Sequence, residues 1–259
     1  HRRVGPINWI GISTLYFKEV WRFAKVATQT VIAPVVTSLL FLAVFTLALG
    51  RSVEQVAGVS FAEFLAPGLI MMSMVQNSFA NTSSSIVISK VQGNIVDLLM
   101  PPLSPGEIVA GFALGGLTRG LAVGIAAAIG MSCFVPIHVH DPFLIAFHAV
   151  AASLLLSQLG ILGGIWADKF DHIAAVTNFV IMPFAFLSGA FYSVQRLPDP
   201  WFTIAHLNPF FYMIDGFRYG FIGHADGSLL VGIALLVGAN AFLLWLIWHL
   251  IATGYKLRP

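Results

Sequence analysis

The chain has 259 residues, of which 58% are hydrophobic and 9% are charged, whereas a soluble domain carries about 25% charged residues. This composition, with a mean hydropathy of +0.89, excludes an ordinary soluble protein and indicates a chain folded within a membrane. The single cysteine, Cys133, excludes an intrachain disulfide framework. The formal net charge of +2 is explained by lysines and arginines on one side of a membrane, so no nucleic-acid partner is expected.

Six long stretches with almost no charge predict six transmembrane helices. Each stretch has at least nineteen residues, and a bilayer core of about 30 Å needs about 20 helical residues. The predicted spans are residues 31–49, 64–88, 108–134, 143–167, 173–194 and 229–253. We therefore predict an all-α membrane protein with one transmembrane domain over residues 1–259, made of an interfacial segment (1–28) and a six-span core (29–259).

The positions of the lysines and arginines predict the orientation of the chain, because cytoplasmic flanks retain these residues. Nine of the thirteen fall on one side of the predicted spans: Arg2, Arg3, Lys18, Arg22, Lys25, Lys90, Lys169, Lys256 and Arg258. Both termini are therefore expected in the cytoplasm. The first span is too long for the apolar part of a signal peptide and lacks a small-residue cleavage site, so no cleaved signal is expected.

Residues 8–27 have the pattern of an amphipathic helix lying at the membrane surface. The apolar residues recur at helical spacing: Trp9, Ile12, Tyr16, Val20 and Phe23. Lys18, Arg22 and Lys25 share another face and are expected to point toward lipid phosphates, with Asn8 as the N-cap. The alternative is a simple cytoplasmic extension of the first span.

The second span carries a polar face that lipid cannot satisfy. Its main residues are three or four apart, and we assign four of them to a candidate translocation path: Ser73, Gln76, Asn77 and Asn81. Thr177 and Asn178 of the fifth span are expected to complete that path. Hydrogen bonding between helices is an equally good explanation of the same face.

A short amphipathic segment follows the second span on the cytoplasmic side. Val91, Ile95, Leu98 and Leu99 follow helical spacing, and Pro101 closes the segment. A helix over residues 90–100 would be too short to cross a membrane. Its apolar stripe is expected to be covered by a partner or by the protein's own helices.

The third span contains a charge and a stripe of small residues. Arg119 is the one charge within a predicted span, and its cost of about 2.5 to 3.5 kcal/mol at mid-bilayer requires that it face protein or water. It is either a substrate or gating contact, or an anchor between helices, and the anchor is favoured. The glycines recur at intervals that permit close packing of helices within one chain: Gly111, Gly115, Gly116, Gly120 and Gly124.

Residues 191–227 are rich in aromatic residues yet interrupted by prolines and charges, so no straight span fits them. Two short re-entrant or interfacial helices on the outer side are expected instead. The aromatic residues suit a belt at the membrane interface: Trp201, Phe202, Phe210, Phe211, Tyr212, Tyr219 and Phe221.

The run LNPFFYMIDGFRYGFIG at residues 207–223 resembles the signature of ABC-2 type exporter permeases, closest to the YadH-like group of bacterial multidrug and lipid exporters. The signature residues are Leu207, Asn208, Pro209, Gly216, Arg218, Tyr219 and Gly223. The resemblance extends through SGAFYSVQRLP (188–198), NIVDLLMPPLSP (94–105) and GGLTRG (115–120), so it covers most of the chain.

This resemblance implies an inner-membrane homodimer of six-span subunits joined to two copies of a cytoplasmic ATPase, which would bind the ATP and magnesium. Residues 8–27 would be the elbow helix. Residues 91–100 would couple to the ATPase through Val91, Ile95, Asp97, Leu98 and Leu99. The expected cargo is a hydrophobic or amphipathic drug or lipid, and the alternative within the family is a polysaccharide or glycolipid.

The source of energy is expected to lie outside this chain. An ion-coupled carrier needs an ionisable group at membrane depth, and no Asp or Glu lies near the centre of a predicted span. The sequence also lacks GxxxxGK[ST], so we expect no ATPase site, no cofactor and no metal in this chain. An ion-coupled carrier, a membrane enzyme and a scaffold without transport are the competing classes.

Overall fold

A computed structural model describes residues 7–50, 52–53, 55–95 and 102–256 of the chain. The described part is almost entirely helical. The long helices are α2 (Ala33–Leu49), α3 (Phe61–Val91), α5 (Pro105–Ser132), α6 (Pro142–Trp166) and α11 (Leu229–Thr253). The shorter ones are α1 (Trp9–Ala24), η1 (Thr28–Ile32), α7 (Phe170–Val176), η2 (Thr177–Ile181), α8 (Met182–Phe186), η3 (Val194–Arg196), α9 (Trp201–Leu207) and α10 (Pro209–Ile222). One antiparallel ribbon, β1 (Gln55–Val56) with β2 (Val59–Ser60), precedes α3.

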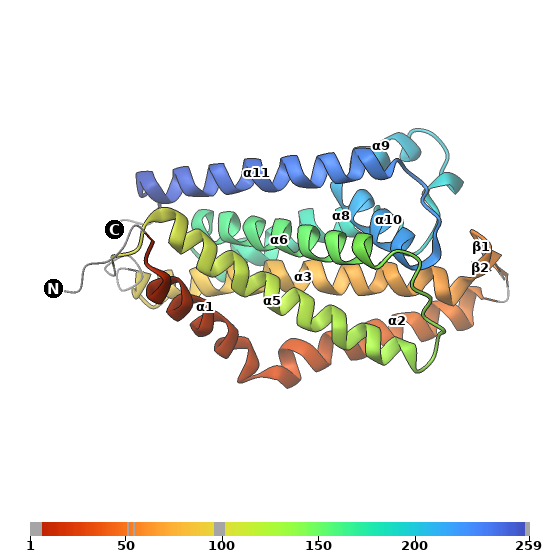
Figure 1. Ribbon diagram of the computed structural model, residues 1–259, viewed down its shortest axis with the longest axis horizontal. Helices are drawn as coiled ribbons and strands as arrows, with labels where there is room; N and C mark the ends of the chain where they lie inside the picture. The colour runs from red at the N-terminus through yellow and green to blue at the C-terminus, as the bar shows by residue number, and fades with distance from the viewer. Residues whose placement is uncertain (1–6, 51, 54, 96–101, 257–259) are drawn as a thin grey trace.

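The helices form an elongated bundle around α3 (Figure 1). α3 makes its most extensive contacts with α6 and α5 and also packs against α10 and α2, so nearly every turn of α3 is buried. The first turn of α1 and the last turn of α11 lie at one end of the bundle, while the β ribbon, α9 and α10 lie at the other (Figure 1). α3 is therefore the central helix of the bundle.

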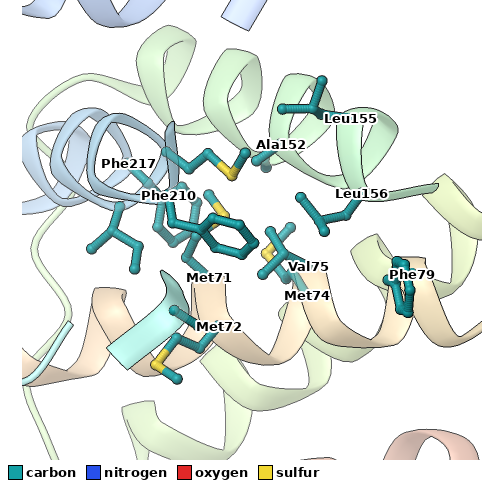
Figure 2. Close-up of a cluster of buried hydrophobic side chains, with 14 of the residues drawn as sticks. Met71, Met72, Met74, Val75, Phe79, Ala152, Leu155, Leu156, Phe210 and Phe217 are labelled. Atoms are coloured by element: carbon teal, nitrogen blue, oxygen red, sulfur yellow. The ribbon is translucent and has the colours of Figure 1, made fainter. Parts of the chain in front are cut away.

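The buried apolar side chains join α3 to α6 and α10, as Figure 2 shows. Met71, Met74 and Val75 of α3 are almost fully buried, as are Leu156 of α6 and Phe217 of α10. Because lipid tails are as apolar as these side chains, the attraction between the helices comes from close packing rather than from removal of water. The fit of the side chains therefore determines how stable this core is.

Glycines allow α5 to approach its neighbours closely. A Cβ added to Gly111 would lie 2.6 Å from Leu15 of α1, and one added to Gly116 or Gly120 would overlap the hydroxyl oxygen of Ser157 or Ser78. These contacts all lie within one chain. The prediction that the glycine stripe serves packing within the protomer is therefore confirmed.

Within the described residues, four helices are long and apolar enough to cross a membrane: Thr28–Leu49, Pro105–Ser132, Pro142–Trp166 and Leu229–Thr253. They correspond to the predicted first, third, fourth and sixth spans. The predicted second span corresponds to α3. This helix has 31 residues but is not one of these four, because its polar face lowers its mean hydropathy. The bounds predicted for the fifth span, 173–194, are wrong, because the apolar helix there covers Phe170–Phe186.

The fifth apolar helix ends early for a local reason. The helix ends at Phe186, and three residues later Gly189 has φ of +76°, a left-handed conformation through which a helix does not continue. The carbonyl oxygens of Gly189 and Ala190 then accept hydrogen bonds from the guanidinium group of Arg218, at 2.9 and 3.2 Å. These carbonyls point toward α10 instead of continuing a helix.

Residues 191–227 fold largely as two short helices, α9 and α10, as the interruptions by proline indicate. Their aromatic residues divide into two groups, so the prediction of one interfacial belt is only partly correct. Trp201 and Phe202 of α9 are exposed, whereas Phe210 and Phe211 of α10 are buried. The α10 side chains belong to the packed core because this helix fits between α6, α3 and α11.

The amphipathic helix α1 begins after Asn8, whose side-chain oxygen accepts a hydrogen bond from the Gly11 amide at 2.9 Å, as predicted for an N-cap. α1 was predicted to lie at the membrane surface with its apolar side in lipid, but one of its faces is buried in the bundle. It buries Leu15, Glu19 and Phe23, while Trp9 and Trp21 are exposed. A short turn after α1 leads into the π-helical segment η1, which continues directly into α2.

Candidate functional site

The polar face of α3 is occupied by hydrogen bonds to three neighbouring helices. The Ser73 hydroxyl pairs with that of Ser38 on α2. The Asn77 side-chain oxygen accepts a hydrogen bond from Arg119 of α5 at 2.9 Å, and its amide nitrogen donates to the Ser73 carbonyl at 2.9 Å. Arg119 thus lies where an anchor between helices is expected, with an amide as its partner.

The next turns of α3 bind the polar side of α1. Arg22 donates to the backbone carbonyl of Asn81 at 2.6 Å and to its side-chain oxygen at 3.1 Å. Glu19 is fully buried and forms an ion pair with Arg22 at 3.1 Å, while the Ser85 hydroxyl donates to Glu19 at 2.7 Å. A buried carboxylate requires such partners, because removing its charge from water is costly.

These contacts correct the prediction for Arg22, which points into the bundle and not toward lipid phosphates. The periodic pattern of α1 shows a polar face but not whether that face meets headgroups or another helix. The available signal was Glu19, an acid three residues before Arg22 in an otherwise apolar and basic helix. Such an i, i+3 pair lies on one side of a helix.

The predicted translocation residues fall into two groups. Ser73 and Gln76 line a cavity of about 130 Å³ that is also bounded by α2, α8 and Phe191. Gln76 reaches the sulfur atom of Met182, at the start of α8, at 3.3 Å. Asn77 and Asn81 contact α5 and α1 through the hydrogen bonds described above.

Thr177 and Asn178 lie on η2, a π-helical turn of the kind that often occurs at functional sites. The Thr177 hydroxyl bonds back to the Ile173 carbonyl at 2.9 Å, and Asn178 is exposed. The described structure therefore does not place Thr177 and Asn178 around the cavity that Ser73 and Gln76 line. The nearest part of the same helical run is Met182, one residue beyond η2.

The segment predicted to couple to an ATPase is described only at its start. Val91 is the last residue of α3, so this helix continues to the beginning of the segment without a break. Ile95 packs partly against the core. Asp97, Leu98 and Leu99 lie outside the described residues.

A charged cluster joins three helices at the same end of the bundle, and the sequence analysis did not predict it. Lys90, in the last turn of α3, donates to the carbonyl oxygens of Ile165 and Ala167 and lies 3.7 Å from the Asp168 carboxylate. Lys256, after α11, lies 3.4 Å from the same carboxylate. We call Lys90, Asp168 and Lys256 the lysine clasp.

The charges of the lysine clasp shift the pKa of Asp168. Desolvation acts to raise the pKa of this carboxyl, but the ammonium groups of Lys256 and Lys90 outweigh it and hold the pKa below its ordinary value. The carboxylate is therefore charged throughout the physiological range. The sequence signal for the clasp was a lysine after each of two predicted spans, but pairing across 78 or more residues is not visible in a local pattern.

The signature residues 207–223 build the end of the bundle opposite to the lysine clasp. Asn208 caps α10, accepting from the Phe210 amide at 3.0 Å, and donates to the Phe184 carbonyl at 2.6 Å. Arg218 is almost fully buried, donates to the Phe64 carbonyl at 3.1 Å and lies over the Phe64 ring. Gly216 fits against His148 and Gly223 ends α10 in a left-handed conformation.

The other signature residues lie at the two ends of α10 and in the last turn of α9. Pro209 occupies the first turn of α10, and the Tyr219 carbonyl accepts the hydrogen bond that closes the helix at Gly223. Leu207, the last residue of α9, is 77% exposed. Apart from Leu207, these residues hold α10 against α3, α6 and the turn after α8.

Comparison with known proteins supports the family resemblance of these motifs. Residues 11–222 match the family described as ABC-2 type transporter. The chain is 39% identical over 252 residues to inner membrane transport permease YadH of Escherichia coli strain K12, covering 97% of this chain and 98% of that protein. It is 28% identical over 227 residues to nodulation protein J of Rhizobium leguminosarum bv. trifolii, covering 85% of this chain and 83% of that protein.

The apolar helices and the interlocked polar contacts define a helical membrane protein of the transport-permease class. This chain belongs to the ABC-2 type transporter family, and the resemblance seen in residues 207–223 is confirmed. It is accordingly an ABC transporter permease.

Proposed function

We propose that this chain is the six-span permease subunit of an ATP-driven exporter in the bacterial inner membrane, with both termini in the cytoplasm. It would work as a homodimer with two copies of a separate cytoplasmic ATPase, which binds the ATP and magnesium. The cargo would be a hydrophobic or amphipathic molecule such as a drug or lipid. The relative named inner membrane transport permease supports the location, and the apolar lining of the cavity supports the class of cargo.

One observation carries this proposal. α3 is a single helix of 31 residues that reaches from the β ribbon, past the cavity at Ser73 and Gln76, to Val91 at the predicted coupling segment. A rigid helix of this kind transmits a displacement of the coupling segment to the cavity. ATP-driven closure of the partner would then change the shape of the cavity and move the cargo outward.

Co-expression with a candidate partner ATPase from the same genome tests the proposal. We expect a stable complex of two permeases and two ATPases, and ATP-dependent transport in vesicles reconstituted with that complex. A complex whose ATPase carries a disabled nucleotide site is the control and should not transport. Transport by the purified permease alone, without an ATPase or nucleotide, would contradict the proposal.

The cavity assignment has its own test within the same complex. Gln76→Leu removes a polar group that lines the cavity, and we expect it to change transport and the stimulation of ATP hydrolysis by cargo. Ser13→Leu, on α1 and away from the cavity, is the control. Unchanged transport in Gln76→Leu would remove the α3 cavity from the translocation path.

A further inference from the structure

A larger pocket lies between α1 and the cytoplasmic end of α3, away from the cavity at Ser73. Its volume is about 500 Å³, which is within the usual range of small-molecule sites, about 300 to 1,000 Å³. α1 supplies one wall with Leu15, Lys18 and Arg22, and α3 supplies another with Ser85 and Ile88. The proposed function makes no use of this pocket.

The charges at the pocket favour an anion. Among the described residues that line it, Lys18 and Arg22 are cations and none is a carboxylate. Glu19, behind the pocket, neutralises one positive charge through its ion pair with Arg22. Arg119 adds a further cation near enough to Arg22 for the two to repel each other.

The hydrogen-bonding groups show the same imbalance. Among the described residues, three buried donor atoms in the interface of α1, α3 and α5 have no acceptor: Arg22 Nε, Asn81 Nδ2 and Arg119 Nε. Buried donors are normally paired, so these three atoms leave hydrogen-bonding capacity unused beside α1. Arg22 belongs both to this interface and to the pocket wall.

The remaining walls and the surroundings favour an amphipathic molecule over a free anion. Leu15, Ile88 and Leu103 give the pocket an apolar side next to the cations. On α1, Trp9 and Trp21 are 70% and 66% exposed, which is typical of a helix whose outer face lies in the membrane interface. The pocket is thus placed at the depth where the headgroups of the inner leaflet lie.

We propose that this pocket binds the acidic headgroup of an amphipathic molecule from the inner leaflet. Lys18 would pair with its phosphate or carboxylate, and Leu15, Ile88 and Leu103 would contact the first carbons of its chain. The ligand is either a resident acidic lipid or the cargo itself. Binding does not depend on the proposed transport cycle, because it is measured at equilibrium without ATP.

The test uses the full permease with its ATPase in lipid nanodiscs, and phosphatidylglycerol in a phosphatidylcholine background as the probe. Lys18→Gln should weaken binding of phosphatidylglycerol about tenfold, the effect of losing one hydrogen bond between charged groups. Lys25→Gln is the matched control, because Lys25 is an exposed cation after the same helix and does not line the pocket. It should change binding less than twofold. Equal losses in the two variants would mean general attraction to an acidic membrane and would overturn the proposal.

A second variant tests the pocket without changing charge. Thr14 lines the pocket and is exposed, so Thr14→Trp should fill the space while leaving α1 folded, and should abolish the preference for phosphatidylglycerol over phosphatidylcholine. Retention of that preference would overturn the proposal. So would binding by the permease alone that disappears when the ATPase is added, because the pocket would then be a protein interface.

Addition of ATP distinguishes the two possible sources of the ligand, cargo and resident lipid. If the ligand is cargo, ATP should move fluorescent phosphatidylglycerol to the outer leaflet of reconstituted vesicles, and Lys18→Gln should slow this movement. If it is a resident lipid, the bound phosphatidylglycerol should remain and ATP should not move it. Either result supports the site, and only the first also requires the proposed transport function.

Discussion

The ion pair between Glu19 and Arg22 shows how a single residue fixes α1 to the bundle. Replacing Arg22 with Met would leave the Glu19 carboxylate buried without its cation, whereas replacing Glu19 with Gln keeps a group that hydrogen-bonds to Ser85. We expect Arg22→Met to cost about 3 kcal/mol of unfolding free energy, the low end for a broken buried pair because Arg22 is 28% exposed. Glu19→Gln should cost less.

Thermal unfolding in detergent, followed by circular dichroism, measures both changes. Lys25→Met, which removes an exposed cation from the same helix, is the control and should change little. Equal destabilisation by Arg22→Met and Lys25→Met would show that the buried pair does not hold α1 in place.

Arg119 and Asn77 form a second contact whose role can be measured at the residue scale. Arg119→Ala should lower stability by about 1.5 to 3 kcal/mol, as expected for a hydrogen bond to a charged group. In a double-mutant cycle with Asn77→Leu, the two losses should not add, because both variants remove the same hydrogen bond. Additive losses would show that the two residues do not stabilise the protein together, whereas lost export with unchanged stability would make Arg119 a substrate or gating contact.

At the scale of helices, the close approach of α5 to α3 and α6 predicts a sharp difference between two glycines. A Cβ at Gly116 would overlap the Ser157 hydroxyl, whereas a Cβ at Gly238 of α11 has no atom within 4 Å. Gly116→Ala should destabilise the protein by about 1 to 3 kcal/mol through overpacking, and Gly238→Ala should stabilise it slightly, because alanine favours a helix more than glycine does. Midpoints of thermal unfolding for the two variants check this, and similar midpoints would contradict the packing described for α5.

The lysine clasp joins the ends of α3, α6 and α11, and its contribution should depend on pH. Because the pKa of Asp168 is lower in the folded protein than its ordinary value of 3.8, its stabilisation is present above that value and is lost as the pH falls through the lowered pKa. The difference in unfolding midpoint between the wild type and Asp168→Asn should therefore be constant from pH 7 to about pH 5 and shrink below about pH 4. A difference that persists unchanged in acid would show that the clasp is not electrostatic.

At the scale of the whole molecule, the coupling segment should connect ATP hydrolysis to transport. Leu98→Ser together with Leu99→Ser, or charge reversal by Asp97→Lys, should lower transport per ATP hydrolysed while the complex still assembles. Leu207→Ser, at an exposed position in the last turn of α9 at the opposite end, is the control. Unaltered coupling in the segment variants would count against mechanical drive through residues 91–100.

Much of this architecture could be predicted from local patterns. Hydropathy located α5, α6 and α11 to within a few residues, because each is apolar over more than 20 positions. The capping box of Ser104 and Glu107 at the start of α5 is formed in the structure, although the sequence analysis did not use it. The signature at residues 207–223 indicated the family, which the relatives confirm.

The contacts between distant segments could not be predicted in this way. Periodicity places Arg22 on a polar face of α1 and Asn81 on a polar face of α3, but it does not show that these two faces are in contact. After the fifth apolar helix, the carbonyls of Gly189 and Ala190 bind Arg218, which lies 28 residues beyond Ala190 in the chain. Such pairings are set by packing in three dimensions, and no pattern within one helix records them.

The junction between α1 and α2 contains little chain that could absorb a movement. The backbone amide of Thr30 in η1 bonds to the Val26 carbonyl, and its hydroxyl bonds to the Phe23 carbonyl in the last turn of α1 at 2.8 Å. From η1 onward the chain is helical as far as Leu49. A tilt of α1 at the surface would therefore twist α2 about its own axis, and Ser38 on α2 would carry that twist to the wall of the cavity. A movement of α1 in the membrane and the proposed movement of residues 91–100 would then both change the shape of this cavity, the first through α2 and the second through α3.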